Sequence, residues 1–346
     1  MERKSRWACV LRVLAAVLLL VLLIWLLGRL TEPKYMSSIP EGALIREYYK
    51  EESAHQVLFL GDCEVYENFS PIKLWEEYGI SSYIRGSAQQ LTWQSYYLLE
   101  EMLAHETPRV VVFNVLALKY GEPQKEAYNR MTLDGMRPSV YKWRAVKASM
   151  TAEESFITYV IPLLRYHSRW NELTGEDFRY LFSRDTVGHS GYLMQTGVVP
   201  LTDMPPVLPL EDSALPETSM QYLEKMAELC RAKGVELILI KAPSVYPHWY
   251  DEWDAQVKDF AASHGLSYYN LLEISEEIGI DWQTDTYDAG LHLNVWGAEK
   301  LATCFGKILT EQHGCVSEKD DATLSALWER KASDYYAEFR ERTQGD

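Results

Sequence analysis

Three short apolar runs constrain the fold of this chain most strongly. They lie at residues 57–60 (VLFL), 109–115 (RVVVFNV) and 235–240 (VELILI). Apolar runs of this length are typical of strands that are buried on both faces, as in a parallel sheet. Shorter strands are expected at 82–85 and 266–270. Because helical patterns separate these segments and crossovers are right-handed, we predict a three-layer α/β/α sandwich with a flavodoxin-like parallel sheet.

The alternation of strands and helices stops between residues 116 and 217. We predict helices over residues 139–148, 152–164 and 176–182, followed by a loop rich in glycine and proline. Such a long excursion inside a compact domain is usually either functional or disordered, and its many aromatic residues favour order. We therefore interpret residues 116–217 as a helical insertion over the ligand-binding edge of the sheet.

The N-terminus carries an apolar stretch from Trp7 to Leu30, which is long enough to span a bilayer. Arginine and lysine residues precede it, so we expect the N-terminus in the cytoplasm and the main domain outside the cell membrane. A cleaved signal peptide is the alternative. The long apolar run, and the lack of a small-x-small cleavage site at residues 28–31, favour an uncleaved single-pass anchor.

These patterns divide the chain into four parts. Residues 1–30 form a cytoplasmic stub and transmembrane anchor, and residues 31–54 form a polar stalk. Residues 55–312 form the α/β domain, and residues 313–346 form a charged tail. Apolar residues recur in the tail at helical spacing, so we expect an amphipathic helix that docks on the domain or on a partner.

Charge and cysteine usage exclude some classes of function. The net charge of -16 argues against nucleic-acid binding, which needs clustered lysine and arginine. The five cysteines show no CxxC or Cys/His spacing, so we expect neither a metal site nor a cofactor. Four of them follow the apolar stretch, and two disulfides are one alternative. The apolar helical patterns around Cys230 and Cys304 favour buried thiols instead, and the state of Cys315 stays open.

Chemically useful residues follow the predicted strands. Cys63 comes after the first strand, Gly86 after the second, and Asn114 ends the third. Asp288 and His292 follow the last strand. The carboxyl ends of parallel strands share one edge of the sheet, which is where ligands bind in open α/β folds. The sequence therefore predicts one functional site at this edge.

These residues fit the requirements of a thiol nucleophile. Such a thiol needs a base and a third group that holds the base. It also needs donors aimed at the developing oxyanion. We assign the first three parts to Cys63, His292 and Asp288. The backbone N–H groups of Cys63 and Gly86, with the Asn114 amide, are the predicted oxyanion donors.

Other residues are weaker candidates. Asp285 is the alternative acid for orienting His292. Several residues are candidates for lining the substrate pocket: Asp62, Lys241, Ser244, Arg165, His167 and Arg169. A structural interpretation stands beside each functional one, because a single cysteine after a strand is often only a small buried hydrophobe.

The motifs at these positions resemble those of the SGNH (GDSL-like) hydrolase and acyltransferase superfamily. Gly61-Asp62-Cys63 is similar to its first block, Arg85-Gly86-Ser87 to the second, and Asn114 to the third. The stretch from Asp288 to His292 is similar to its last block. The chain departs from the pattern twice, because cysteine replaces serine and the Asp–His spacing is one residue longer. The resemblance covers residues 57–309 apart from the insertion.

With its anchor, the chain most resembles the membrane-tethered branch of DltD-type D-alanylation proteins and alginate-type O-acetyltransferases. This resemblance implies a membrane-embedded partner that supplies acyl groups. We therefore expect extracytoplasmic acyl transfer to a cell-envelope glycopolymer through a Cys63 thioester. An SGNH-like esterase acting on acylated glycans is one alternative. A catalytically inactive SGNH-like scaffold or binding protein is the other.

Overall fold

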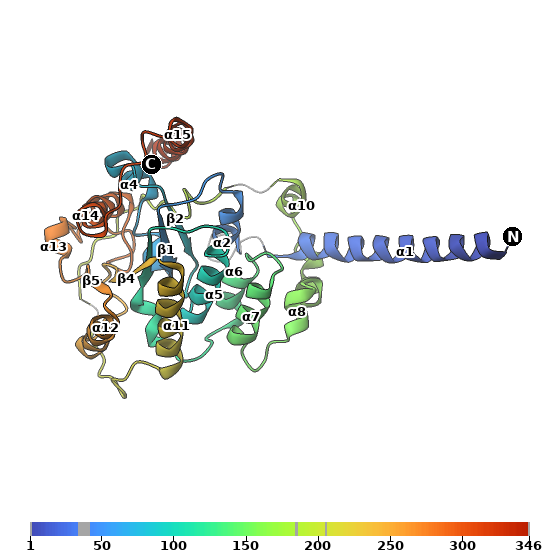
Figure 1. The fold of residues 1–346 in the computed structure, drawn as a ribbon, viewed down its shortest axis with the longest axis horizontal. Coiled ribbons are helices and arrows are strands. Elements are labelled where there is room, and N and C mark those ends of the chain that lie inside the picture. The colour runs from blue at the N-terminus through green and yellow to red at the C-terminus, as the bar shows by residue number, and fades with distance from the viewer. Residues whose placement is uncertain (1, 34–41, 184–185, 205, 345–346) are drawn as a thin grey trace. The chain divides into compact units, whose positions relative to one another are not determined.

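The computed structural model describes residues 2–33, 42–183, 186–204 and 206–344 (Figure 1). The chain divides into two compact units. The anchor unit comprises residues 1–41 and 152–186, and the sheet unit comprises residues 42–151 and 187–346. Part of the predicted stalk, residues 34–41, lies outside the described residues.

The sheet unit contains five parallel strands in the order β2-β1-β3-β4-β5. They are β1 (Val57–Gly61), β2 (Ser82–Gly86), β3 (Val110–Asn114), β4 (Glu236–Lys241) and β5 (Ser267–Asn270). This order confirms the predicted flavodoxin-like parallel sheet. Residues 57–60 and 110–114 are completely shielded from solvent, as the continuous apolar runs predict for central strands.

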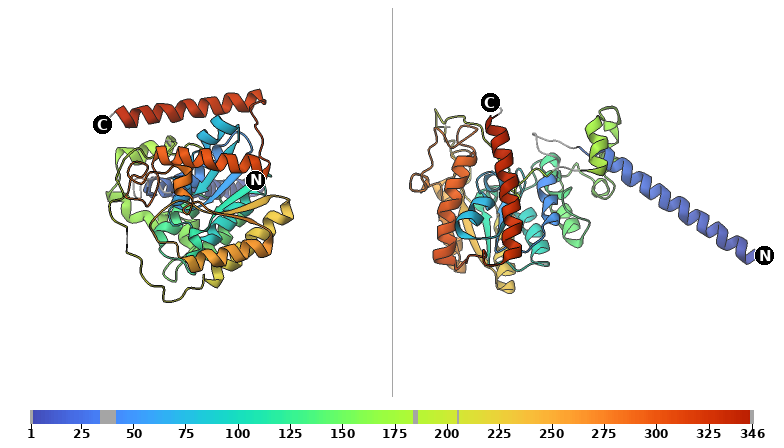
Figure 2. Two further views of the ribbon diagram at one scale, coloured as in Figure 1. Left: turned by 90° about the vertical axis from the view of Figure 1, so that its left-hand side faces the viewer. Right: turned by 90° about the horizontal axis from the view of Figure 1, so that it is seen from above.

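The helices of the sheet unit cover both faces of the sheet (Figures 1 and 2). Helices α4 and α14 pack together, as do α5 and α11, and this gives the predicted three layers. The helical elements are α2 (Ala43–Glu47), η1 (Tyr48–Lys50), α3 (Cys63–Tyr66), α4 (Pro71–Tyr78), α5 (Thr92–Met102), η2 (Val115–Lys119), α6 (Glu126–Leu133), α7 (Val140–Ser149), α11 (Glu217–Lys233), α12 (Asp251–His264), α13 (Ser275–Ile278), α14 (Val295–His313) and α15 (Ala322–Gln344).

The tail forms the predicted helix and docks on the sheet unit. Trp328 of α15 stacks on Trp75 of α4, with ring centroids 5.2 Å apart and planes 12° from parallel. The Tyr335 hydroxyl donates to Glu299 at 2.8 Å. Trp328 and Tyr335 are almost fully buried, so the apolar face of the tail helix is covered by its own chain.

The anchor unit contains α1 (Glu2–Thr31), α8 (Phe156–Val160), α9 (Leu163–Tyr166), η3 (His167–Asn171) and α10 (Gly175–Phe182). Within α1, the segment from Trp7 to Thr31 is long and apolar enough to cross a membrane, with a mean hydropathy of 3.0. A signal sequence can have the same length and composition. Helix α1 contacts α9, η3 and α10.

The central region differs from the sequence prediction in two ways. The single helix expected over residues 152–164 is wrong: α8 ends at Val160 and α9 begins at Leu163. Pro162 explains the break, because proline lacks the N–H that a continuing helix needs. Residues 116–217 are also divided between the units, because α6 and α7 belong to the sheet unit and residues 152–186 to the anchor unit.

All five cysteines are free thiols. Cys230 and Cys315 are buried, and Cys63 and Cys304 are partly buried. The alternative of two disulfides is therefore wrong for this structure, and the interpretation of Cys230 as a buried thiol is confirmed.

Candidate active site

Cys63 stands at a tight turn between β1 and α3. Gly61 precedes the turn with φ 156°, and a Cβ at this position would lie 2.5 Å from Val65 Cγ2. Only glycine fits this approach. Asp62 then caps α3, because its side chain accepts from the Glu64 N–H at 3.2 Å. Cys63 is consequently the first residue of the helix, at the carboxyl edge of the sheet.

A buried ion pair between Lys241 and Glu64 holds the residue that follows Cys63 in this turn. Lys241 Nζ lies 3.0 Å from both carboxylate oxygens of Glu64, and neither side chain is exposed to solvent. Ser244 also donates to Glu64, and Lys241 donates to the Ala242 carbonyl at 2.6 Å. Lys241 and Ser244 were expected to line a pocket. Instead they are completely buried and hold Glu64, because a charged carboxylate inside a protein must be paired.

Asn114 belongs to the same buried network. Its Nδ2 donates to Glu64 at 2.9 Å and to Asp62 at 3.2 Å, and its Oδ1 accepts from the Ala242 N–H at 3.0 Å. An amide nitrogen has two hydrogens, and carboxylates take both. The expected contribution of the Asn114 side chain to the oxyanion site is therefore wrong for this arrangement.

Gly86 lies directly beside the turn. It pairs with Gly61 across β1 and β2. A Cβ at Gly86 would lie 3.0 Å from the Gly61 carbonyl oxygen and 3.4 Å from that of Asp62. Glycine is thus needed for close approach of the two backbones. A role for its N–H at the oxyanion remains a prediction.

Asp62 is buried as well, which affects its charge. Burial and the charge of Glu64 raise the pKa of Asp62 to about 6, and Lys119 and Lys241 oppose this rise. The carboxylate is 3 % exposed and is occupied by Glu64 N–H and Asn114. Asp62 therefore shapes the turn rather than lining an open pocket.

His292 is held by the carboxylate four residues before it. His292 Nδ1 lies 2.7 Å from Asp288 Oδ2, and the His292 backbone N–H donates to Asp288 Oδ1 at 2.8 Å. The longer Asp–His spacing is accommodated by positive φ angles at Ala289 (60°) and Gly290 (92°). Asp285 does not contact the ring. Its carboxylate instead pairs with Lys300 at 2.6 Å.

A second carboxylate reaches the same ring nitrogen. Glu67 Oε2 lies 3.2 Å from His292 Nδ1, and the Tyr287 hydroxyl donates to Glu67 at 2.7 Å. The Tyr287 ring lies over His292, with centroids 5.9 Å apart and planes 14° from parallel. Sequence reasoning missed both residues. The signal for Glu67 was its place four residues after Cys63, one helical turn away.

Cys63 and His292 each change the pKa of the other. His292 Nε2 is buried and makes no hydrogen bond of ordinary length and angle among the described residues. The charge of His292 nevertheless lowers the pKa of the Cys63 thiol.

Burial and the neighbouring charges shift the pKa values of both Cys63 and His292. Burial raises the pKa of Cys63 to about 11, although His292 lowers it. Burial lowers the pKa of His292, but Cys63, Asp288 and Glu67 raise it to about 12. The two protons belong to the pair as a whole. The Cys63 thiolate raises the pKa of His292 and the His292 imidazolium lowers the pKa of Cys63, so the two charged forms stabilise each other.

We expect alkylation of Cys63 by iodoacetamide to accelerate by about tenfold per pH unit between pH 7 and pH 10, because only the thiolate reacts. Peptide-resolved mass spectrometry measures the rate. Cys304 is the control, since burial raises its pKa but no histidine acts on it. Replacement His292→Asn should slow alkylation of Cys63 alone. A rate for Cys63 that is constant over this range would contradict the raised pKa.

The remaining candidates lie in the anchor unit. Arg169 donates to the Thr31 carbonyl at 2.8 Å, and His167 Nδ1 lies 3.1 Å from the Leu164 carbonyl oxygen. The Arg165 guanidinium lies 5.7 Å from the Tyr166 ring centroid. These three residues were candidates for lining the pocket. The structure gives Arg165, His167 and Arg169 partners within the anchor unit. None of the three is among the residues that shift the pKa of Cys63 or His292 most strongly.

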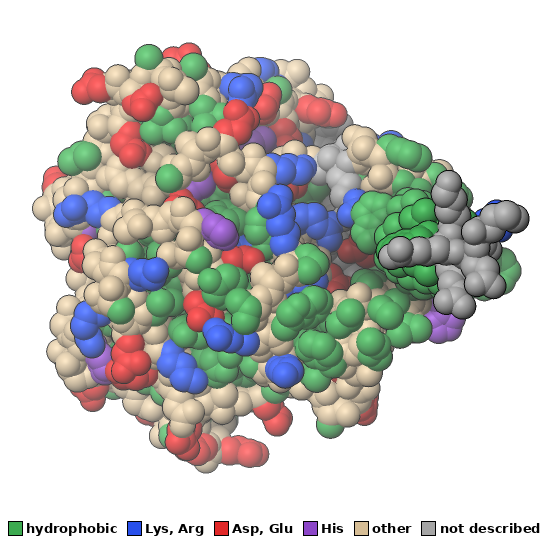
Figure 3. Space-filling view, turned by 45° about the vertical axis from the view of Figure 1, so that its right-hand side comes forward, with side chains coloured by type: hydrophobic (Ala, Val, Ile, Leu, Met, Phe, Trp, Pro, Cys, Tyr) green, Lys and Arg blue, Asp and Glu red, His purple; other side chains and the backbone are tan. Residues whose placement is uncertain are grey.

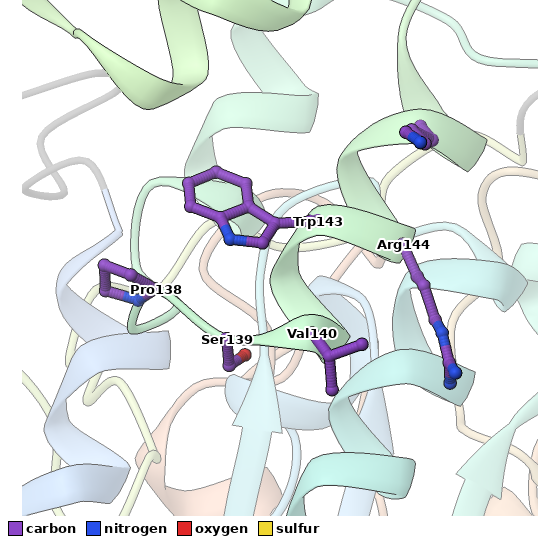
Figure 4. Close-up of a pocket in the computed structure, with 6 residues that line it drawn as sticks. Pro138, Ser139, Val140, Trp143 and Arg144 are labelled. Atoms are coloured by element: carbon purple, nitrogen blue, oxygen red, sulfur yellow. The ribbon is translucent and has the colours of Figure 1, made fainter.

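Two other features of the structure concern ligand binding. Within the described ranges, no group of three or more His, Cys, Asp or Glu residues is arranged to hold a metal ion. A shallow hollow on the sheet unit is lined by Pro138, Ser139, Val140, Trp143, Arg144 and Lys147 (Figure 4). None of the predicted site residues contributes to this hollow.

Two remote structural neighbours are found among the solved structures. No family model and no curated protein matches the sequence. A candidate acylhydrolase from Bacteroides fragilis matches with a TM-score of 0.38 and 11% identity, over 78% of this chain and 95% of its own. A gut microbial diltiazem-metabolizing enzyme matches with a TM-score of 0.27 and 14% identity, over 74% and 47%.

Fold and site together define a class of protein. It is an α/β protein with Cys63 at the carboxyl edge of a parallel sheet and with His292 held by Asp288, and His292 lowers the pKa of Cys63. Thiol, imidazole and carboxylate in this order are the groups of nucleophilic acyl chemistry.

Proposed function

We propose that this protein transfers acyl groups through a thioester on Cys63. The observations that support it most are the Asp288 carboxylate 2.7 Å from His292 Nδ1 and the effect of His292, which lowers the pKa of Cys63. A thiol beside an imidazole whose far nitrogen is held by a carboxylate is a nucleophile with its base. Glu67 adds a second carboxylate on the same nitrogen.

The reaction has two balanced steps. The Cys63 thiolate attacks the carbonyl carbon of the donor, and the leaving group takes a proton from the His292 imidazolium. An acceptor hydroxyl then attacks the thioester and gives its proton to His292, so that an ester forms and the carbon–sulfur bond breaks. Asp288 keeps the ring oriented in both steps.

The oxyanion of each step needs donors other than the Asn114 side chain, whose amide is occupied. We assign this part to the backbone N–H groups of Cys63 and Gly86. Cys63 is the first residue of α3, and an N–H at that position has no acceptor within its own helix. Donors of this kind stabilise tetrahedral intermediates strongly.

We further propose that the reaction takes place outside the cell membrane. The positive residues before the apolar span favour a cytoplasmic N-terminus, and α1 would then hold the sheet unit on the opposite side. The acceptor would be a cell-envelope glycopolymer and the donor a membrane-embedded partner, as the family resemblance implies. With water as acceptor, the same groups would act as an esterase on acylated glycans.

One observation favours a different class of function. Burial raises the pKa of Cys63 to about 11, so most of the thiol is protonated near neutral pH. A scaffold or binding protein without catalytic activity would tolerate such a thiol. If the protein is an enzyme instead, the Cys63 thiolate must form when the donor is bound.

Trapping the acylated protein tests the proposal. The purified full chain in detergent is incubated with p-nitrophenyl acetate, and the Cys63 peptide should gain an acetyl group that hydroxylamine removes. Cys63→Ala should abolish this adduct, and Cys304→Ala should retain it, because Cys304 has no histidine beside it. Ester cleavage that survives in Cys63→Ala contradicts the thioester. If the native chain shows no adduct and no ester cleavage, the result favours the inactive scaffold.

A further inference from the structure

The anchor unit exposes an unusual number of large apolar side chains. We call its short helices α8, α9, η3 and α10, residues 156–182, the collar. Phe182 is 91% exposed and Trp170 is 72% exposed. The large apolar residues exposed on the collar are Ile157, Val160, Leu164, Trp170, Phe178 and Phe182. Water-facing apolar clusters of this kind mark interaction surfaces.

The collar is attached to the last turns of α1. A Cβ at Gly28 would lie 3.6 Å from the Leu163 backbone nitrogen, so α1 and α9 approach closely. Arg169 of η3 donates to the carbonyl of Thr31, the final residue of α1, at 2.8 Å. Helix α10 contacts α1 as well. The position of the collar is therefore determined by the carboxyl end of α1.

The length of α1 places that end at the surface of a bilayer. The apolar segment has 25 residues and is about 37 Å long at 1.5 Å per residue. The hydrocarbon core of a bilayer is about 30 Å thick. The apolar side chains of α1 contribute the green region at the right of Figure 3 and are mostly exposed, as contact with lipid requires. When α1 spans the core, its last turn lies among the lipid headgroups.

Helix α10 has the polarity of an interfacial helix. Asp177 and Tyr180 are buried within the anchor unit, whereas Phe178 and Phe182 are exposed. The two phenylalanines are four residues apart and share one face of the helix. Aromatic side chains concentrate where the bilayer meets water, and amphipathic helices lie in that plane.

We propose that the collar is a lipid-binding surface that lies in the headgroup region beside α1. Trp170, Phe178 and Phe182 enter the boundary between headgroups and acyl chains. Their contact with lipid restricts the tilt and rotation of the anchor unit, which a single helix alone does not fix. This proposal rests on α1 spanning the membrane and is independent of the chemistry at Cys63.

Lipid quenching of a fluorophore on the collar tests the proposal. Full-length Phe182→Cys, with Cys9, Cys63 and Cys304 replaced by serine, is labelled with NBD and reconstituted in phosphatidylcholine–phosphatidylglycerol vesicles. Phe182 tolerates replacement because it is exposed, and Cys230 and Cys315 are buried. Val316→Cys in the same background is the control, since Val316 is an apolar residue of the sheet unit that is 65% exposed. Leu18→Cys reports the insertion of α1.

Headgroup-proximal doxyl lipids should quench the label at residue 182 at least about threefold more than the label at residue 316. A label at residue 18 that is quenched by deep doxyl lipids, together with an unquenched label at residue 182, overturns the proposal and leaves the collar as a surface for a protein partner. If the label at residue 18 is not quenched, α1 does not span the bilayer, and the proposal is overturned as well. Acyl-transfer assays of the native chain are unaffected by either outcome, so the two proposals fail separately.

Discussion

Replacing His292 by alanine is expected to lower the rate of Cys63 acylation by about 10²–10⁴-fold, the usual contribution of a positioned general acid–base. The variant loses the group that lowers the pKa of Cys63 and the proton donor for the leaving group. The rate is measured as p-nitrophenol release and as the acetyl adduct on the Cys63 peptide. His264→Ala is the control, because His264 pairs with Glu224 at the end of α12. A His292→Ala variant with the native rate would exclude the proposed role.

The same assay separates the two aspartates that the sequence offered. Asp288→Asn removes the charge that lies 2.7 Å from His292 Nδ1 and should lower the rate. Asp285→Asn removes the partner of Lys300 and should loosen the loop that carries Asp285 without changing the charge beside the imidazole. If Asp285→Asn had the larger effect on the pH profile of acylation, the contact seen in the structure would not be the functional one.

Replacing Lys241 by methionine is expected to reduce the free energy of unfolding of the sheet unit by about 3–5 kcal/mol, because it leaves a buried charge without its partner. Lys241 and Glu64 are both fully buried, and water cannot solvate the remaining carboxylate. Urea unfolding in detergent micelles, followed by tryptophan fluorescence, measures the change. A loss within experimental error would mean that the buried pair does not stabilise the sheet unit.

Two variants show whether the loss comes from the unpaired charge. Lys73→Met breaks the partly exposed pair with Glu77 and should cost no more than about 1 kcal/mol, as surface pairs do. Glu64→Gln combined with Lys241→Met should recover part of the loss, because glutamine keeps the shape of the side chain without the charge. A double variant as unstable as Lys241→Met would assign the loss to packing instead.

The fold was accessible from local patterns. The apolar runs at 57–60 and 110–113 became fully buried strands that lie side by side in the sheet. Helix α4 starts at Pro71, and Ser70 caps it by accepting from the Lys73 N–H. Such signals are local because periodicity, caps and turns depend on neighbouring residues.

The supporting part of the site was not accessible in this way. Glu64 and Lys241 are 177 residues apart, and nothing near either residue indicates the pairing. The same holds for Glu67 and Tyr287, which meet at His292 from positions 220 residues apart. Asn114 was correctly placed at the carboxyl edge, but its orientation toward two carboxylates depends on Glu64, which sequence reasoning did not weigh.

By itself, the sequence determined the parallel sheet, the edge that carries Cys63 and His292, and the apolar segment of α1. These follow from hydrophobic periodicity and chain order. Only the tertiary structure decided which carboxylates hold His292, that Lys241 supports the Cys63 turn, and that residues 152–186 join α1. The physical reason is that burial and charge pairing act between segments far apart in the chain, so their partners are known only once the fold has brought them together.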